Sequence, residues 1–293
     1  MSLSFELTGV LVNFHSEYVP VQLITKWTGS LAIERDAPVD DLDLHLYMDP
    51  IAHHDLTDGS DFVPYAIVYR STIANPSFAK ADAQAVLRET LSAIRLIKSM
   101  WIAMPLSWVR LFDEAGSVLF SHVSVDGWEL AQSRLGEDSS PSIFGQRDLA
   151  ALQLVADCIS AYPDKASGDD ARRMRIAIER FNYAIDRVRP EDKLLDLAIA
   201  LEALFVVRAD YDAGSRISDQ IAQRCCLYLE SLRHDHALLS EVKAWYRVRS
   251  TIVHGGDPGD DLTAAIGGLG QLTRRTIKKE LLEPGSLARL RAL

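Results

Sequence analysis

The segment from Tyr246 to Gly256 brings a strong cation and a titratable base to the end of a predicted helix. Arg249 precedes His254 by five residues, and two glycines follow the histidine. A guanidinium binds phosphate oxygens well, and an imidazole exchanges protons near neutral pH. These two side chains therefore have the chemistry that RNA cleavage requires.

Arg249 stands in an otherwise apolar stripe of this predicted helix, which comprises Val242, Trp245, Ile252 and Val253. A cation that faces a core or an interface needs a partner. Glu202 is the only charged residue between positions 197 and 205, within another predicted helix. We therefore expect Glu202 and Arg249 to face each other, either as a structural ion pair or as part of an active site.

His254 is predicted to end the helix, because a glycine just after the last turn is typical of a C-terminal cap. A histidine in that place is often only a cap. At about 100° per residue, His254 lies about 140° around the helix from Arg249. Arg247 and Ser250 are closer to the face of His254, so Arg247 is a second candidate for holding a phosphate. If two copies of the helix pair about a two-fold axis, both sets of side chains could line one shared cleft.

The stretch from Arg249 to His254 resembles the R-x4-6-H signature of HEPN domains (higher eukaryotes and prokaryotes nucleotide-binding). Its surroundings extend the resemblance: a run from Leu194 to Phe205, then Arg216-Ile217 opening the next helix, then Tyr246 to Gly255. This order and spacing is similar to the Apea-like HEPN family of prokaryotic proteins, over about residues 145–290.

The resemblance implies a helical bundle that dimerises through the motif helix and, in active members, cleaves RNA without a metal or cofactor. His254 would exchange protons with the 2′-hydroxyl and the leaving 5′-oxygen, Arg249 would stabilise the developing phosphorane charge, and Glu202 would orient Arg249. Ser250 would donate a hydrogen bond to the phosphate, where many catalytic members have Asn, Asp or His. Arg247 and Thr251 are weaker candidates for phosphate binding.

Such ribonucleases occur in antiphage defence, abortive infection and toxin–antitoxin pairs. We therefore expect an endoribonuclease whose partners are RNA, a second copy of the chain and, in some contexts, an antitoxin or another protein. The alternative is a noncatalytic HEPN protein that dimerises through the bundle and binds RNA or a protein.

The bulk composition is that of an ordinary globular protein of 293 residues, with 48% hydrophobic and 25% charged residues. The formal net charge is -10, and residues 1–75 hold 11 acidic and 3 basic side chains, a net charge of -8. This balance argues against a generic nucleic-acid coat protein, which needs many Lys and Arg, but not against a local RNA site. No targeting segment is recognisable and no stretch approaches the ~20 apolar residues of a membrane span, so we expect a cytoplasmic protein.

The N-terminal part is predicted to be an α+β domain over residues 1–135. Segments rich in β-formers predict strands at 5–14, 21–33, 42–48 and 62–69, and a hairpin at 107–112 and 117–125. Between them, a helical period begins after Pro76, with Ser77 as the expected N-cap, and ends before Pro105. These elements predict a mostly antiparallel sheet with one long helix.

The C-terminal part is predicted to be an all-α helical bundle over residues 145–290, after a polar linker at 136–141. Helices are expected near 146–161, 169–187, 191–208, 214–233, 237–254 and 259–282, with Pro163 among the predicted breaks. Arginines crowd the segments 172–189 and 274–291, where the alternatives are a basic surface or solvated helix faces.

Other motifs carry less chemistry. His53, His54 and Asp55, with His45 nearby, lack the spacing of a metal site. Gly267-Gly268-Leu269-Gly270 lies in a helical context without the preceding strand that a phosphate-binding loop needs. Cys158, Cys225 and Cys226 lie in apolar helical patterns, which favours buried free thiols.

Overall fold

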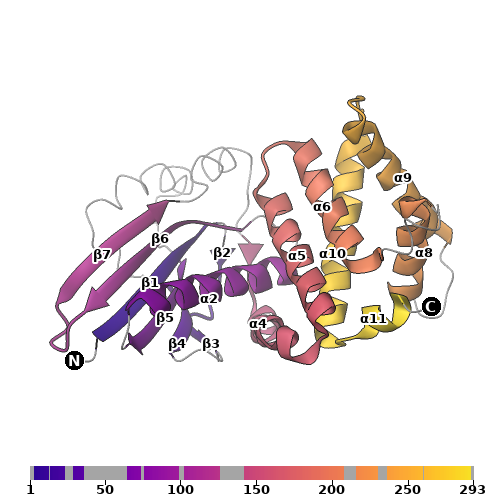
Figure 1. The fold of residues 1–293 in the computed structure, drawn as a ribbon. Helices are drawn as coiled ribbons and strands as arrows, with labels where there is room; N and C mark the ends of the chain where they lie inside the picture. Colours follow the sequence, from indigo (N-terminus) through magenta and orange to yellow (C-terminus); the bar gives the residue numbers. More distant parts are fainter. Residues whose placement is uncertain are drawn as a thin grey trace. The chain divides into compact units, whose positions relative to one another are not determined.

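The computed structural model describes residues 3–12, 14–23, 29–35, 65–73, 76–98, 102–125, 142–207, 216–229, 236–259 and 261–291 (Figure 1). Contacts between residues divide the chain into two compact units, Met1–Asp157 and Cys158–Leu293. The division falls within helix α4 (Gln146–Lys165), whereas the sequence predicted a boundary at 136–141, outside the described residues. An antiparallel sheet is followed by a helical region, as expected.

The first unit is built on a six-stranded antiparallel sheet with the order β3-β4-β5-β1-β6-β7. Its strands are β1 (Leu3–Val12), β3 (Val21–Leu23), β4 (Ser30–Arg35), β5 (Tyr65–Ile73), β6 (Ala103–Phe112) and β7 (Val118–Val125). A second, parallel pair joins β2 (Phe14–His15) to β8 (Ser142–Ile143). The single strand predicted at 21–33 is wrong, because Val21 pairs with Ile33 and the chain therefore reverses between β3 and β4. The strand expected at 42–48 lies outside the described residues.

Helix α2 (Pro76–Ile97) covers one face of this sheet (Figure 1). A Cβ on Gly9 of β1 would lie 2.2 Å from Met104 Sδ and 3.2 Å from Leu87 Cδ1, so the helix packs directly over a strand that lacks a side chain there. Leu87 and Ile94 of α2 are buried. The helix begins at Pro76, so Ser77 is a helical residue and not the predicted N-cap; proline is well suited to the first helical position.

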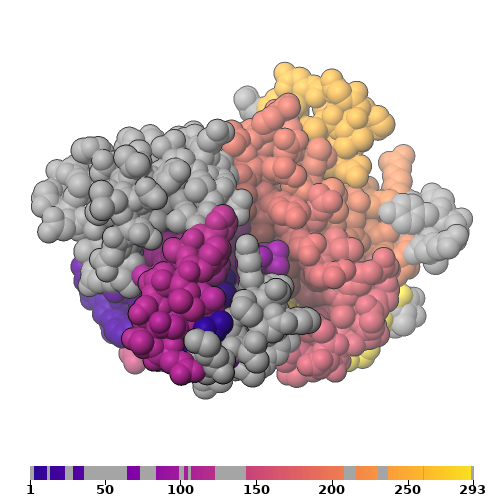
Figure 2. Space-filling view, turned by 60° about the vertical axis from the view of Figure 1, so that its left-hand side comes forward, coloured from indigo at the N-terminus to yellow at the C-terminus, as the bar shows by residue number. Residues whose placement is uncertain are grey.

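The predicted hairpin of β6 and β7 is present. Its turn is tied by Asp113, whose Oδ1 accepts hydrogen bonds from the backbone N–H groups of Ala115 and Ser117. Strand β7 is an edge strand and reaches the surface of the first unit, where it is magenta in Figure 2. Phe120 on this strand is 53% exposed.

A row of alternating charges crosses the sheet face opposite α2. Register places Arg70 of β5 and Arg110 of β6 on either side of Glu6 of β1. Glu6 accepts hydrogen bonds from both arginines, and Arg70 also binds Glu34 of β4 through two nitrogens. We call these four residues the charged row; their formal charges sum to zero.

The second unit is helical. It contains the end of α4, then α5 (Gly168–Asp186), α6 (Pro190–Phe205), α8 (Ile217–Leu229), α9 (His236–Val253), α10 (Asp261–Leu282) and α11 (Ser286–Arg291). Helix α4 runs through Pro163 to Lys165, so the predicted break there is wrong: a proline removes only one hydrogen bond, and Ala166 N–H still reaches Tyr162 O at 3.0 Å. The short helix α11 was not predicted.

Helix α6 is the centre of this unit and contacts α5, α8, α9, α10 and α11. Its apolar side chains are buried on several sides, and they include Leu194, Leu197, Ala198, Leu201 and Leu204. A helix that is apolar nearly all round belongs in a core, which explains why a charged residue on α6 must find a partner on another helix.

Candidate functional site on helices α6 and α9

Helices α6 and α9 bring Glu202 and Arg249 together, as the sequence predicted. Arg249 Nη2 lies 3.3 Å from Glu202 Oε1, and the two side chains are 32% and 20% exposed. The pair is thus partly shielded and still reachable from solvent. A site that must receive a substrate needs that combination of shielding and access.

The guanidinium of Arg249 is only partly used. Its Nε atom is buried, and no hydrogen-bond acceptor for it lies among the residues that the structure describes. A guanidinium carries five N–H donors, and a buried donor without an acceptor is costly. Because the Arg249 side chain is 32% exposed, terminal N–H groups that Glu202 does not use face solvent, where a phosphate can reach them.

Partial burial raises the pKa of Glu202 above its ordinary value, and the positive charge of Arg249 opposes that rise. Burial is the larger of the two effects. Glu202 consequently binds its proton more tightly in the folded protein than in the unfolded chain.

His254 occupies the C-cap position of α9, as expected from the glycines after it. Gly255 has φ +76°, its N–H donates to Ile252 O at 3.0 Å, and the N–H of Gly256 donates to Thr251 O at 2.9 Å. This pair of hydrogen bonds defines a Schellman motif, which ends a helix with backbone groups alone. The His254 side chain is exposed and plays no part in the cap.

The three remaining predicted site residues surround this helix end. Arg247 and Ser250 are exposed, whereas Thr251 is half-buried. The Thr251 hydroxyl donates to Arg247 O at 3.1 Å, so its proton is not free for a phosphate in this arrangement. Ser250 and Arg247 are exposed and can be reached by an incoming ligand.

The apolar stripe predicted for α9 is partly wrong. Val242 is fully buried, but Val253 is 51% exposed, and Tyr246, which the stripe left out, is only 5% exposed. The Tyr246 hydroxyl donates to Ala198 O of α6 at 3.3 Å. Tyr246 therefore belongs to the buried side of α9, on which Arg249 also lies, whereas Val253, at the last helical position, is at the surface beside His254.

Trp245 fixes the position of α9 on α10. Gly268 of α10 lies so close to the indole that an added Cβ would meet Trp245 Cζ2 at 2.0 Å. Trp245 precedes Arg249 by one helical turn on the same side of α9. Gly268 thus allows the close approach of two helices that sets the depth of Arg249.

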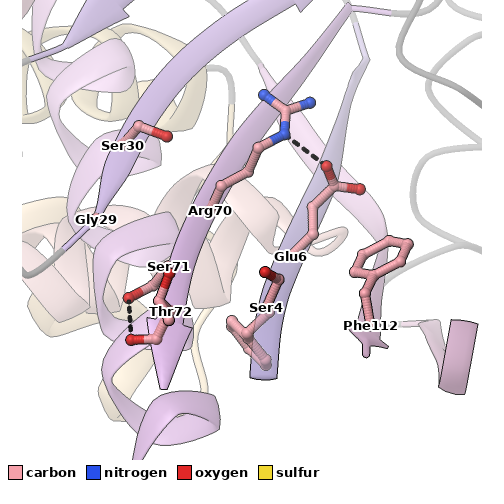
Figure 3. Close-up of a pocket in the computed structure, with 9 residues that line it drawn as sticks. Ser4, Glu6, Gly29, Ser30, Arg70, Ser71, Thr72 and Phe112 are labelled. Carbon is pink, nitrogen blue, oxygen red and sulfur yellow. Dashed lines mark hydrogen bonds and ion pairs between the residues drawn. The ribbon is translucent and has the colours of Figure 1, made fainter. Parts of the chain in front are cut away.

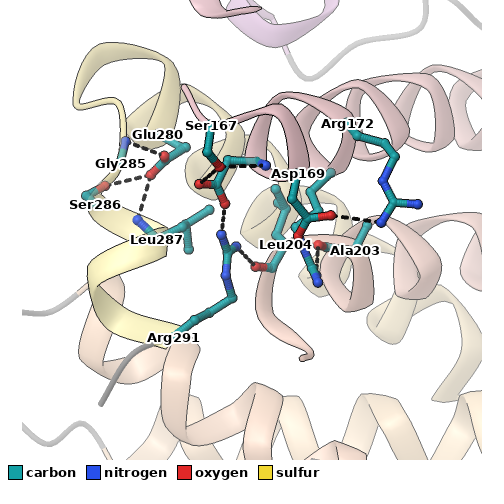
Figure 4. A network of polar contacts seen from close by, with 12 residues as sticks. Ser167, Asp169, Arg172, Ala203, Leu204, Glu280, Gly285, Ser286, Leu287 and Arg291 are labelled. Atoms are coloured by element: carbon teal, nitrogen blue, oxygen red, sulfur yellow. Dashed lines mark hydrogen bonds and ion pairs between the residues drawn. The ribbon is translucent and has the colours of Figure 1, made fainter. Parts of the chain in front are cut away.

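Three arginines hold the C-terminal end of α6, immediately after Glu202. The last carbonyls of a helix lack intrahelical partners, and here Arg173 donates to Ala203 O and Val206 O, Arg224 to Phe205 O, and Arg291 to Leu204 O. They come from α5, α8 and α11, and Figure 4 shows Arg291 reaching Leu204. The helix dipole also favours positive charge at this end. The backbone that carries Glu202 is therefore fixed from three directions.

Two further carboxylates tie the second unit together. Asp196 of α6 is 3% exposed and accepts hydrogen bonds from Arg180 and Arg187 at 2.8 and 2.7 Å. Glu280 of α10 is 1% exposed, and its two oxygens accept hydrogen bonds from the hydroxyls of Tyr162 and Tyr228. They also accept hydrogen bonds from Gly285, Ser286 and Leu287 (Figure 4). Buried carboxylates with this many donors hold the helices of the unit together.

Sequence reasoning missed the three arginines that hold α6. Arg173 belongs to the arginine-rich segment 172–189, which indicated a charged surface, and Arg291 to the segment 274–291. Their partners are carbonyl oxygens, which every residue has, so spacing alone gave no signal for them. Only the fold identifies which helix end each arginine reaches.

Comparison with protein-family models, curated proteins and solved structures found no match. Within the described ranges, no group of three or more His, Cys, Asp and Glu side chains is placed to hold a metal ion; His45, His53, His54 and Asp55 lie outside those ranges. No helix in the described part of the chain is long and apolar enough to cross a membrane.

Proposed function

We propose that the second unit is a metal-independent HEPN-type endoribonuclease that acts as a homodimer. The observation that carries this proposal is the Arg249–Glu202 pair, in which a partly shielded arginine keeps unused donors, on the helix that ends in exposed His254. A carboxylate that orients a guanidinium, with an imidazole at the end of the same helix, is suited to phosphoryl transfer.

In this mechanism His254 accepts the proton of the RNA 2′-hydroxyl, and the 2′-oxygen attacks the adjacent phosphorus. The bond from phosphorus to the 5′-oxygen breaks, and that oxygen takes up a proton from an imidazolium. Arg249 stabilises the charge on the pentacoordinate phosphorus, while Glu202 holds the guanidinium in place. Ser250 and Arg247 bind the phosphate of the same strand. The products carry a 2′,3′-cyclic phosphate and a 5′-hydroxyl.

A second copy of the chain would supply the side chain that one α9 helix cannot bring to the phosphate. Arg249 and His254 lie about 140° apart around α9, which is too wide for one phosphate to meet both side chains directly. Two α9 helices paired about a two-fold axis would bring the histidine of one copy toward the arginine of the other. The half-exposed Val253 gives such a pairing apolar surface beside the site. Under this proposal the dimer, not the single chain, is the enzyme.

The decisive experiment incubates the full chain with total RNA and with tRNA in the presence of EDTA. Wild-type protein is expected to produce fragments with 2′,3′-cyclic phosphate ends, and His254→Ala to produce none while keeping the dimer and the circular dichroism spectrum. Thr251→Val is the matched control, because its hydroxyl bonds the helix backbone and should be dispensable. Cleavage by His254→Ala at the wild-type rate would rule out the assignment.

A noncatalytic role is the second candidate, and one observation favours it: Glu202 already neutralises Arg249. In that case the bundle dimerises or binds RNA, and the first unit contacts a protein partner. This candidate predicts that the protein cleaves no RNA under any condition. It also predicts that Glu202→Ala lowers stability and has no other effect.

The biological setting that fits either candidate is the prokaryotic cytoplasm, in antiphage defence, abortive infection or a toxin–antitoxin pair. The proposal for this setting rests on the motif from Arg249 to His254. Coexpression with neighbouring genes, followed by mass spectrometry of the purified chain, tests whether an antitoxin binds it or modifies a motif side chain.

A further inference from the structure

A cavity of about 700 Å³ opens on the sheet of the first unit (Figure 3). It lies over the face opposite α2, because side chains alternate along β1 and Gly9 marks the face that α2 covers. Ser4 of β1, Thr72 of β5 and Phe112 of β6 share one register row, and Glu6 and Arg70 form the next. Cavities of this volume are typical of small-molecule sites.

The charge in the cavity is balanced. Arg70 Nε lies 2.6 Å from Glu6 Oε2, and its Nη1 and Nη2 lie 2.6 and 3.0 Å from the oxygens of Glu34. Arg110 binds the other oxygen of Glu6. The charges of the charged row thus neutralise one another. A charged ligand would gain little binding free energy by displacing one of these side chains, because it would break an existing ion pair. A neutral ligand is favoured.

Polar groups and one ring remain for such a ligand. The hydroxyls of Ser4, Ser30 and Thr72 are on exposed residues that line the cavity. The Arg70 side chain is 42% exposed, so N–H groups not used by Glu6 and Glu34 can reach the cavity. Phe112 lines the opposite side and offers an apolar ring (Figure 3).

Gly29 shows that the backbone in this place is tightly defined. A Cβ on Gly29 would lie 2.5 Å from Arg70 O and 2.9 Å from the Tyr69 ring. Gly29, just before β4, therefore lies directly against β5, and it lines the cavity next to Ser30. The register of β4 and β5 places Ser30 opposite Arg70.

We propose that this cavity binds a small neutral ring compound with hydroxyl groups, which stacks on Phe112 and is hydrogen-bonded by Ser4, Ser30, Thr72 and the outer N–H groups of Arg70. Nucleosides and hexoses share this chemistry. A stack on one aromatic ring with a few fixed polar contacts is a common design for such ligands. The inference concerns the first unit only and does not depend on the nuclease activity of the second.

The test measures binding to the full chain by isothermal titration calorimetry and by saturation-transfer NMR. Adenosine, uridine and glucose are compared with adenosine 5′-monophosphate, uridine 5′-monophosphate and glucose 6-phosphate. At least one neutral compound is expected to bind with a submillimolar Kd, and its phosphorylated form at least about tenfold more weakly. The nucleoside and sugar arms then separate the two sources of the ligand.

Two variants test the geometry. Phe112→Ala should weaken binding at least about tenfold, whereas Phe120→Ala, on the exposed part of β7 outside the cavity, should leave it unchanged. Thr72→Val keeps the side-chain shape and should weaken binding by roughly two- to tenfold, the loss of one neutral hydrogen bond. The proposal is overturned by no binding of any neutral compound at millimolar concentration, by equal binding of the phosphorylated forms, or by unchanged binding in folded Thr72→Val protein.

Discussion

A single methyl group on α10 should distinguish two adjacent glycines. Gly267 and Gly268 both lie inside the helix, but a Cβ on Gly267 meets no atom within 4 Å, whereas a Cβ on Gly268 meets Trp245 Cζ2 at 2.0 Å and Cε2 at 2.3 Å. Gly267→Ala and Gly268→Ala are therefore the same chemical change in two environments. We expect effects of opposite sign on the free energy of unfolding.

The magnitudes follow from two opposing terms. Replacing glycine by alanine in a helix interior stabilises by up to about 1 kcal/mol, and Gly267→Ala should show most of that gain. At Gly268 the same gain is opposed by the overlap with Trp245, since carbon atoms prefer separations near 3.5–4.0 Å. Forcing helices apart in a packed core costs roughly 1–3 kcal/mol. Gly268→Ala should thus be less stable than Gly267→Ala by about that amount.

Urea unfolding followed by circular dichroism gives the two free energies, and calorimetry gives the accompanying shift in Tm. A third variant, Gly268→Ala with Trp245→Leu, removes the ring and should recover part of the loss. Because Trp245 is one turn from Arg249, RNA cleavage should fall in Gly268→Ala and persist in Gly267→Ala. Equal stability of the two single variants would show that Trp245 does not hold α9 against α10 in the way described.

Three further outcomes are expected. Burial raises the pKa of Glu202 above its ordinary value of 4.5, so the contribution of protonated Glu202 to stability is complete below that value and is lost as the pH rises through the pKa of the folded protein. In urea unfolding at several mildly acidic pH values, Glu202→Gln should remove this decline in stability. The same pH profile in the variant and the wild type would contradict the burial argument. The Arg291 side chain is 9% exposed and donates hydrogen bonds to Leu204 O and Asp170, so Arg291→Gln should lower the free energy of unfolding by about 1–3 kcal/mol. Arg289 is exposed, and Arg289→Gln should change that free energy by no more than about 0.5 kcal/mol. Similar losses in both variants would point to a general charge effect. Gly255 has φ +76°, so Gly255→Ala should lower the free energy of unfolding by about 1–2 kcal/mol. It should also reduce RNA cleavage, because the end of α9 and His254 shift. Full activity in this variant would argue against a role for His254 in the reaction.

The Arg249–Glu202 contact was predictable because each partner stood out against an apolar pattern. A single acid in nine residues of α6 and a single cation in the stripe of α9 had no other obvious partner. The end of α9 was also predictable, since Gly255 and Gly256 specify a Schellman motif through local backbone chemistry alone.

The details that failed depend on neighbours far away in the sequence. Val253 fits the helical period of α9 but is half-exposed at the end of the helix, whereas Val242 and Tyr246, earlier on the same side, are buried. Pro163 looked like a break, but a proline in the last turn disturbs little. In the sequence, Gly268 was considered only as part of a phosphate-binding loop and rejected. In the fold, it allows α10 to lie directly against Trp245.

Because a Schellman motif ends α9, His254 can be substituted with little effect on the fold. All of the motif's hydrogen bonds join backbone atoms, so the identity of the residue at the C-cap does not decide whether the helix ends there. The imidazole can be removed, replaced by glutamine or substituted with a noncanonical side chain while the chain reversal persists. A loss of function at this position therefore reports on the chemistry of the ring rather than on folding, which cannot be said of the half-buried Arg249.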